Sequence, residues 1–198
     1  MAVRMSADLR REQILDVTKS IVDQRGFHAV SIEAVARAAG ISRPIVYEHF
    51  ESLQGLLEAL VQREGARALN QLRAVLPTGS ASANARDQLI DALRAYLIAV
   101  REDPVTWQLV LMPEEGAPQL LRDQISAGRD QVVAQLAEIA RPGFGPGRES
   151  PDPELSARVM SAIADEFARQ LLTDPERFPL KRLIAHAEWL LDQLGVPV

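Results

Sequence analysis

Side chains suited to recognising another molecule gather in the stretch SIEAVARAAGISRPIVYEHF, which runs from residue 31 to residue 50. If residues 43–50 form a helix, Val46 and Phe50 share one face of it. Arg43 and Tyr47 fall on the opposite face, where a guanidinium and a phenol can donate hydrogen bonds. A short helix that exposes such donors suits contacts with phosphate oxygens and base edges.

Local signals predict that this stretch forms two short helices joined by a tight turn. Ser31 can accept a backbone N–H bond at the start of the first helix, and Gly40 suits its left-handed end. We expect Ser42 to cap the second helix by accepting from the amide of Ile45, because Pro44 has no N–H. The spacing is typical of a helix-turn-helix, whose second helix enters the DNA major groove, and equally of an ordinary αα-hairpin.

The composition favours a helical protein of one or two small domains. The chain has 198 residues, of which 47% are hydrophobic, 25% charged and 5% aromatic. It has no cysteine, which excludes disulfides and thiolate metal sites. The net charge of −5 argues against non-specific coating of nucleic acid. With no secretion signal or membrane span visible, we expect a soluble cytoplasmic protein.

An enzyme is not favoured. The three histidines have the wrong spacing for a helical di-iron site, and no phosphate-binding loop, zinc cluster or nucleophile elbow is present. We therefore expect no catalytic residue, metal or cofactor. Asp165 and Glu166 are expected to give one solvated carboxylate and one partner for Arg169, with Asp165 four residues before that arginine.

Helical periodicity continues through the rest of the chain, and no strand pattern appears. A helix is predicted over residues 8–25, and a long one from the cap Ser52 to Pro77 supports the N-terminal helices. Further helices are expected over residues 84–102, 105–112, 119–140, 153–173 and 180–194. The prediction is an all-α fold of about nine helices, with a helix-turn-helix domain at 1–51 and a helical domain at 52–198.

The N-terminal pattern resembles the TetR family of bacterial transcriptional repressors. The resemblance covers about 45 residues without an insertion. It rests on Ile14-Leu15, Ile21-Val22, Gly26-Phe27, Ser31, Val35-Ala36, Ala39-Gly40-Ile41-Ser42, Tyr47, His49 and Phe50. It implies a dimer that binds a palindromic operator. It also implies that a small-molecule effector releases this dimer from the DNA.

The resemblance also implies roles for individual residues in binding double-stranded DNA. Ser31, Ser42, Tyr47 and His49 correspond to phosphate contacts, and Arg43 and Pro44 to neighbours of base edges. Glu33 is expected to face the groove from the preceding helix, and Ile45 to meet a thymine methyl. Leu53 stands where the family often has a lysine. A degenerate helical interaction module that no longer binds DNA is therefore the alternative.

For the C-terminal domain, the family implies an effector pocket and a dimer interface. Large side chains give the candidates for a pocket that takes a small apolar or amphipathic molecule: Tyr96, Trp107, Met112, Met160 and Phe167. The alternative is that these residues are plain core. Apolar stripes on the last two helices predict the homodimer interface: Leu155, Val159, Ile163, Phe167, Leu183, Ala187, Leu190 and Leu194. The alternative is that these stripes pack on the preceding helices.

Overall fold

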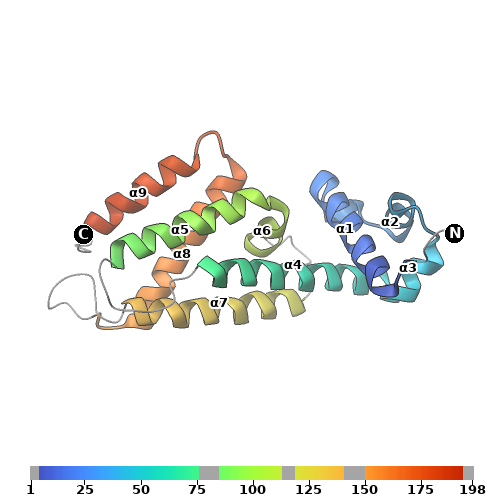
Figure 1. The fold of residues 1–198 in the computed structure, drawn as a ribbon, viewed down its shortest axis with the longest axis horizontal. Helices are drawn as coiled ribbons and strands as arrows, with labels where there is room; N and C mark the ends of the chain where they lie inside the picture. Colours follow the sequence, from blue (N-terminus) through green and yellow to red (C-terminus); the bar gives the residue numbers. More distant parts are fainter. Residues whose placement is uncertain (1–4, 76–84, 113–118, 141–149, 194–198) are drawn as a thin grey trace. The chain divides into compact units, whose positions relative to one another are not determined.

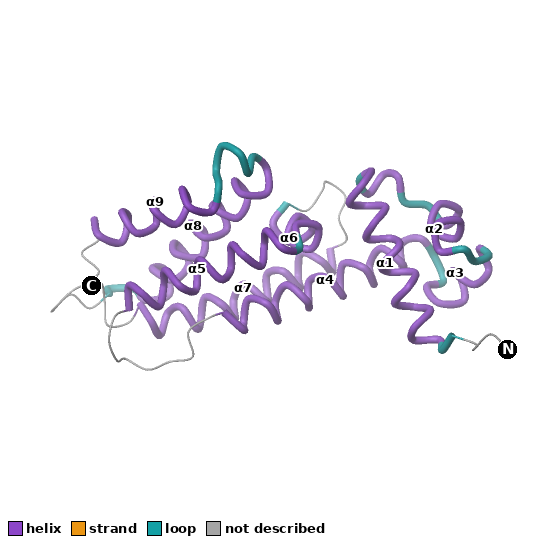
Figure 2. The backbone as a smooth tube through the Cα atoms, turned by 45° about the horizontal axis from the view of Figure 1, so that its top comes forward, coloured by secondary structure: helices purple, strands orange, loops and turns teal. Residues whose placement is uncertain are grey.

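The computed structural model describes residues 5–75, 85–112, 119–140 and 150–193, and within these ranges the regular structure is helical throughout. Nine α-helices and one 3-10 turn follow one another along the described ranges (Figures 1 and 2). They are α1 (Ala7–Arg25), η1 (Phe27–Ala29), α2 (Ile32–Ala39), α3 (Arg43–Phe50), α4 (Leu53–Val75), α5 (Ala85–Glu102), α6 (Pro104–Leu111), α7 (Gln119–Ala140), α8 (Pro153–Thr173) and α9 (Leu180–Gln193). The predicted fold class is confirmed. No helix of the described ranges is long and apolar enough to cross a membrane.

The helices form two compact units. The N-terminal unit comprises residues 1–64 and 118–121, and the C-terminal unit comprises residues 65–117 and 122–198. The N-terminal unit extends past residue 51 because Leu56 and Leu60 of α4 are fully buried in its core. The predicted functional boundary between residues 51 and 52 stays a prediction.

The core of the N-terminal unit is built by one apolar face from each of its four helices. Ile14 of α1, Val35 of α2, Val46 of α3 and Leu56 of α4 are each fully buried there. Thr18 is a polar residue buried beside them, and its hydroxyl donates to the carbonyl of Ile14 at 2.7 Å. Burial of a well-packed aliphatic side chain contributes roughly 1.5–3 kcal/mol, so these contacts dominate the stability of the unit.

The turn between α2 and α3 forms as predicted at its first end and differently at its second. Ser31 Oγ accepts from the amide of Ala34 at 3.1 Å, and Gly40 has φ 65° in the left-handed region. The amide of Ile41 donates to the carbonyl of Ala36, as in a Schellman motif. The predicted Ser42 side-chain cap is wrong, because the amide of Ile45 donates to the backbone carbonyl of Ser42 instead.

Two polar side chains of α1 hold the carboxyl ends of α2 and α3. Gln13 Nε2 donates to the carbonyl of Ala39 at 3.3 Å, and Arg11 Nη1 donates to the carbonyl of His49 at 2.9 Å. The Arg11 guanidinium also lies 4.4 Å from the centre of the Phe50 ring. Because unpaired carbonyls at a helix end favour cationic or amide donors, these bonds hold the ends of α2 and α3 against α1.

The connection between α3 and α4 is tight. Glu51 has φ 61°, and the amide of Ser52 donates to the carbonyl of Phe50 at 2.6 Å, which makes a γ-turn. Ser52 then caps α4 as predicted, since its hydroxyl accepts from the amide of Gly55 at 3.0 Å. A Cβ atom at Gly55 would lie 2.4 Å from the carbonyl oxygen of Phe50, so only glycine fits.

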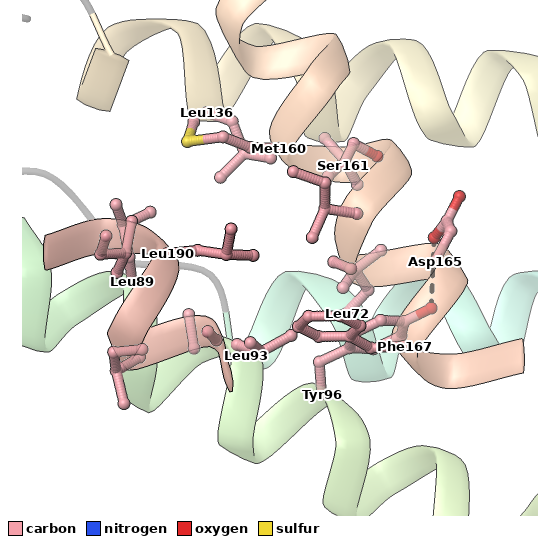
Figure 3. Close-up of a pocket in the computed structure, with 17 residues that line it drawn as sticks. Leu72, Leu89, Leu93, Tyr96, Leu136, Met160, Ser161, Asp165, Phe167 and Leu190 are labelled. Atoms are coloured by element: carbon pink, nitrogen blue, oxygen red, sulfur yellow. Dashed lines mark hydrogen bonds between the residues drawn. The ribbon is translucent and has the colours of Figure 1, made fainter. Parts of the chain in front are cut away.

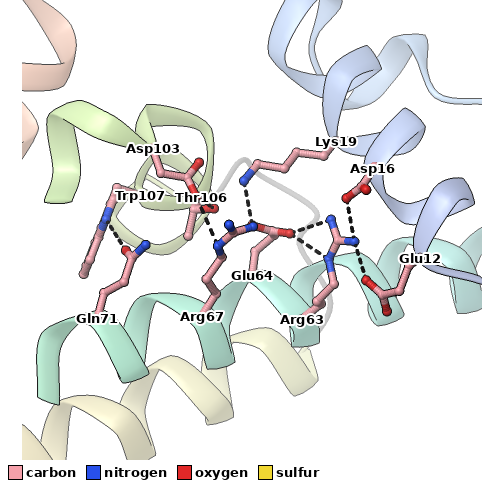
Figure 4. Close-up of polar contacts among 10 residues, drawn as sticks. All are labelled: Glu12, Asp16, Lys19, Arg63, Glu64, Arg67, Gln71, Asp103, Thr106 and Trp107. Atoms are coloured by element: carbon pink, nitrogen blue, oxygen red, sulfur yellow. Dashed lines mark hydrogen bonds and ion pairs between the residues drawn. The ribbon is translucent and has the colours of Figure 1, made fainter. Parts of the chain in front are cut away.

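A buried ion-pair cluster joins α1 to the last part of α4 that belongs to the N-terminal unit (Figure 4). The Glu64 side chain is fully buried and lies 2.8 Å from both Lys19 Nζ and the Arg63 guanidinium. Arg63 also pairs with Glu12 and Asp16 of α1. Burial lowers the pKa of Arg63, but the hydrogen bonds that Arg63 donates to Glu12 and Glu64 outweigh it and raise the pKa overall.

The C-terminal unit packs α5 against both α8 and α9, and α6 against α8. Leu97, Trp107 and Ala168 are among the residues buried in its largest apolar cluster. The Trp107 indole N–H donates to Gln71 of α4 at 3.1 Å, and Asp103 pairs with Arg67 of the same helix (Figure 4). A second cluster around Val132 and Val133 joins α7 to α8 and to Leu72 of α4.

Candidate nucleic-acid interface and ligand cavity

The exposed face of α3 carries the side chains that spacing places there. Tyr47 is 48% exposed, whereas Val46 and Phe50 on the opposite face are buried. Arg43 and Pro44 at the start of the helix are exposed, and Ile45 and His49 are half-buried. A helix held by its apolar face and by Arg11 therefore presents a cation and a phenol to the outside. Their contacts with DNA stay a prediction.

Glu33 of α2 is tied to this face. The Arg43 guanidinium donates to the Glu33 carboxylate at 2.6 Å, and both side chains are exposed. A hydrogen bond from its own backbone amide, and then the bond from Arg43, lower the pKa of the Glu33 carboxyl. The sequence pattern predicts both residues at the DNA interface but does not reveal their ion pair, because Glu33 and Arg43 are ten residues apart on different helices.

The remaining residues considered for the DNA interface are Ser31, Ser42 and Leu53. The Ser31 hydroxyl already accepts a backbone bond within α2, and Ser42 is exposed. Leu53, which replaces the family's usual lysine, is half-buried and packs on the core of the N-terminal unit. The leucine therefore contributes packing at a position where the family often has a charge.

The C-terminal unit contains a partly open, mainly apolar cavity of about 150 Å³, to which α4, α5, α7, α8 and α9 contribute (Figure 3). Three of the five predicted pocket residues line it, namely Tyr96, Met160 and Phe167. Trp107 and Met112 do not. Trp107 is buried with its ring 5.0 Å from that of Tyr96, and Met112 packs half-buried beside the core and accepts a weak bond from Thr173.

One side of the cavity is polar. The Tyr96 hydroxyl donates to Asp165 at 3.3 Å, and Arg129 of α7 donates to the other Asp165 oxygen at 2.5 Å. Burial, followed by the nearby Asp165 charge, raises the pKa of Tyr96 well above its ordinary value, so the phenol keeps its proton. The predicted pairing of Asp165 with Arg169 is wrong, because Arg169 pairs with Glu166 at 3.0 Å.

The residues predicted for the dimer interface divide into two groups. Leu155, Val159 and Ile163 follow one another at steps of four along α8 and are 58%, 52% and 39% exposed. By contrast, Phe167, Leu183 and Ala187 are buried in the unit's own core, and Leu190 is half-buried against it. Leu194 lies outside the described residues. The exposed stripe on α8 thus fits the prediction better than α9 does.

Comparisons with known proteins agree with this geometry. Residues 14–60 match the family described as "Bacterial regulatory proteins, tetR family". The regulator UidR of Escherichia coli is 31% identical over 197 residues, which cover 98% of this chain and 95% of UidR. The transcriptional activator FasR of Mycolicibacterium smegmatis is 30% identical over 171 residues, which cover 86% of this chain and 76% of FasR.

Solved structures share the fold. A TetR-like transcriptional regulator from Rhodococcus sp. RHA1 superposes with a TM-score of 0.74 at 24% identity, covering 96% of this chain and 97% of that one. Since the UidR match extends over nearly the whole of both chains, the chain belongs to the TetR family of helix-turn-helix transcriptional regulators, a family of DNA-binding proteins rather than enzymes.

Proposed function

We propose that the chain binds a palindromic operator as a homodimer in the cytoplasm and leaves it when a small apolar or amphipathic effector occupies the cavity. The observation that carries the proposal is the exposed face of α3. Arg43 and Tyr47 are exposed on this face, whereas the opposite face of the helix is buried in the core. A helix of this kind fits the major groove of DNA.

In this proposal the contacts divide by type. Arg43 reads a base edge, with Pro44 beside it, and Ile45 meets a thymine methyl. The groups that hold the DNA backbone are Ser31, Ser42, Tyr47 and His49. Such phosphate contacts fix the position of the helix, whereas base contacts select the sequence. Glu33 faces the groove and sets the geometry of Arg43 through their ion pair.

The homodimer is supported by the apolar stripe on α8. Leu155, Val159 and Ile163 share one side of the helix and are exposed although each is aliphatic. If this stripe pairs with the same stripe of a second chain across a two-fold axis, the apolar surface is removed from water. The dimer then presents two helix-turn-helix units to the two half-sites of an operator. Binding two half-sites together supplies affinity that one head lacks.

The effector acts through the cavity of the C-terminal unit. A ligand shifts the equilibrium between DNA-binding and released forms only by preferring one of them. Occupancy of an operator that overlaps a promoter gives repression, which is the direction we propose. The relative FasR is named as an activator, so relatives of this chain are not all repressors.

Selection of binding sites from random duplex DNA tests the proposal. We expect an enriched palindrome, and Arg43→Ala should relax the base preference at one position of each half-site by about 1–3 kcal/mol. Tyr47→Phe should weaken all sequences alike, and Arg25→Ala, which removes a cation at the end of α1, serves as the control. If no sequence is enriched at low salt, the chain is instead an interaction module without DNA binding.

A further inference from the structure

We propose that the cavity selects a small uncharged molecule that donates a hydrogen bond, such as a phenol or a compact alcohol, and rejects carboxylates. The inference rests on the proposed effector role of this cavity and names the chemical class of its ligand. It follows from the size of the cavity, from the hydrogen-bonding state of its polar groups and from the charges around them.

The walls fit a compact apolar body. Leucines and a methionine from five helices surround most of the cavity, and Figure 3 shows Leu89, Leu136 and Leu190 away from Asp165. A volume of about 150 Å³ is small, since clefts for drug-sized ligands reach about 300–1,000 Å³. An apolar cavity of about this size holds a single aromatic ring. The body of the ligand is therefore a ring or a short branched chain.

The polar side of the cavity offers mainly acceptors. The Tyr96 proton is engaged on Asp165, so the phenol oxygen faces a ligand with its lone pairs. The Asp165 side chain is only 15% exposed and its carboxylate can only accept. Ser161 precedes Asp165 by one helical turn of α8, lines the same cavity and is 8% exposed. A ligand that donates a proton satisfies this group of oxygens.

The charges near the cavity disfavour ionic ligands. Asp165 is the only charged residue among the described residues that line it. A ligand carboxylate would place a second negative charge beside Asp165, where Arg129 already pairs with the first and the mainly apolar walls solvate the added charge poorly. Arg129 already compensates the Asp165 charge at 2.5 Å, so a ligand ammonium would lose its hydration without meeting a free anion. A neutral donor avoids both penalties.

Calorimetric titration of the full-length protein with four probes of similar size tests the proposal. The probes are p-cresol, p-xylene, p-toluate and p-methylbenzylammonium, which share a methylated ring and differ in the polar group. We expect p-cresol to bind about tenfold more tightly than p-xylene, because one hydrogen bond is added to the same ring. The two ions should bind more weakly than p-xylene. Tighter binding of either ion than of p-cresol, or binding of none of the four at millimolar concentration, overturns the proposal.

Variants tie the selectivity to the named oxygens. Tyr96→Phe keeps the ring and should remove most of the preference for p-cresol over p-xylene. Asp165→Asn should improve binding of p-toluate by roughly tenfold or more, because Arg129 is then left without its carboxylate partner. Glu166→Gln is the matched control, since Glu166 is exposed, pairs with Arg169 and does not line the cavity. A loss of selectivity in the control as large as in Asp165→Asn overturns the assignment.

DNA binding is measured separately, so that the two proposals fail separately. If p-cresol binds as expected but operator affinity does not change, effector release is refuted and the ligand class is supported. If p-toluate binds most tightly and releases the operator, the ligand class is refuted and effector release is supported. Circular dichroism of each variant confirms that its helices are intact.

Discussion

The guanidinium of Arg43 lies 2.6 Å from the carboxylate of Glu33, so the first residue of α3 is held by the helix that precedes it. Both side chains are exposed on the surface that we propose faces DNA. An arginine held in this way has a fixed direction, which suits a contact with one base edge. The same pair also occupies hydrogen-bond donors that a phosphate would otherwise take.

Glu33→Gln should therefore tighten binding to all DNA while reducing the preference for the operator. The variant removes a negative charge and frees Arg43 to follow the phosphates. One added phosphate contact steepens the dependence of log Kd on log salt by about 1. Fluorescence anisotropy at several salt concentrations measures this slope. Glu48→Gln removes an exposed charge from α3 itself, and an equal change there would show that charge alone explains the effect.

The Glu33 carboxyl should titrate below its ordinary value of 4.5. Its backbone amide and Arg43 both lower the pKa, so the pair contributes stability above the unfolded-state pKa and loses it as the pH falls through the lowered folded-state value. In Arg43→Ala the midpoint should rise, yet stay below 4.5, because the amide bond persists. NMR titration of the side-chain carbon measures both midpoints, and an unchanged midpoint would contradict the ion pair.

The turn between α3 and α4 should be sensitive to single carbon atoms. Gly55→Ala places a Cβ against the Phe50 carbonyl and should lower the free energy of unfolding by about 1–3 kcal/mol. Glu51→Gly should raise it by about 1 kcal/mol, because glycine adopts φ 61° without strain. Urea unfolding measures both changes. The control is Gly65→Ala in the middle of α4, where a Cβ meets no atom within 4 Å and helix propensity should add about 1 kcal/mol.

Glu64→Gln should be among the most destabilising conservative changes in the N-terminal unit. It leaves Lys19 and Arg63 without the fully buried carboxylate that both contact at 2.8 Å. Breaking a buried pair by removing one partner costs about 3–5 kcal/mol. Glu12→Gln removes an exposed partner of the same arginine and should cost less than about 1 kcal/mol. Urea unfolding measures both losses of unfolding free energy. Equal losses in Glu64→Gln and Glu12→Gln would show that burial of the carboxylate does not decide the effect.

Sequence predicted the parts of this structure that depend on neighbours along the chain. The Ser31 cap, the left-handed Gly40 and the exposure of Tyr47 all follow from spacing within about ten residues. The bond from Arg11 to the His49 carbonyl was not predictable, because 38 residues separate its partners.

The same limit applies to the candidate sites in the C-terminal unit. Asp165 pairs with Arg129 of α7 and not with Arg169 of its own helix. This partner was not predictable, because spacing within one helix does not reveal a partner on another. Likewise, the periodicity of α9 identified an apolar stripe but not its partner. Leu183 and Ala187 are buried in the core of their own unit, whereas the sequence pattern predicts them at the dimer interface.

The exposed stripe of α8 gives the last prediction, which concerns the homodimer. Val159→Asp places a carboxylate in the centre of the stripe, between Leu155 and Ile163. In a dry interface an unpaired charge is very costly, so the dimer should dissociate at micromolar concentration. The monomer should fold normally, because Val159 is 52% exposed and leaves no cavity when replaced.

Analytical ultracentrifugation and operator binding measure the outcome together. The variant should sediment as a monomer, keep its helical circular-dichroism signal and lose most of its operator affinity, because one head binds one half-site without the gain from the second. Leu9→Asp makes the same chemical change at an exposed leucine of α1 and should leave the sedimentation unchanged. A Val159→Asp protein that stays dimeric, or a wild-type protein that sediments as a monomer at the same concentration, contradicts an interface at α8.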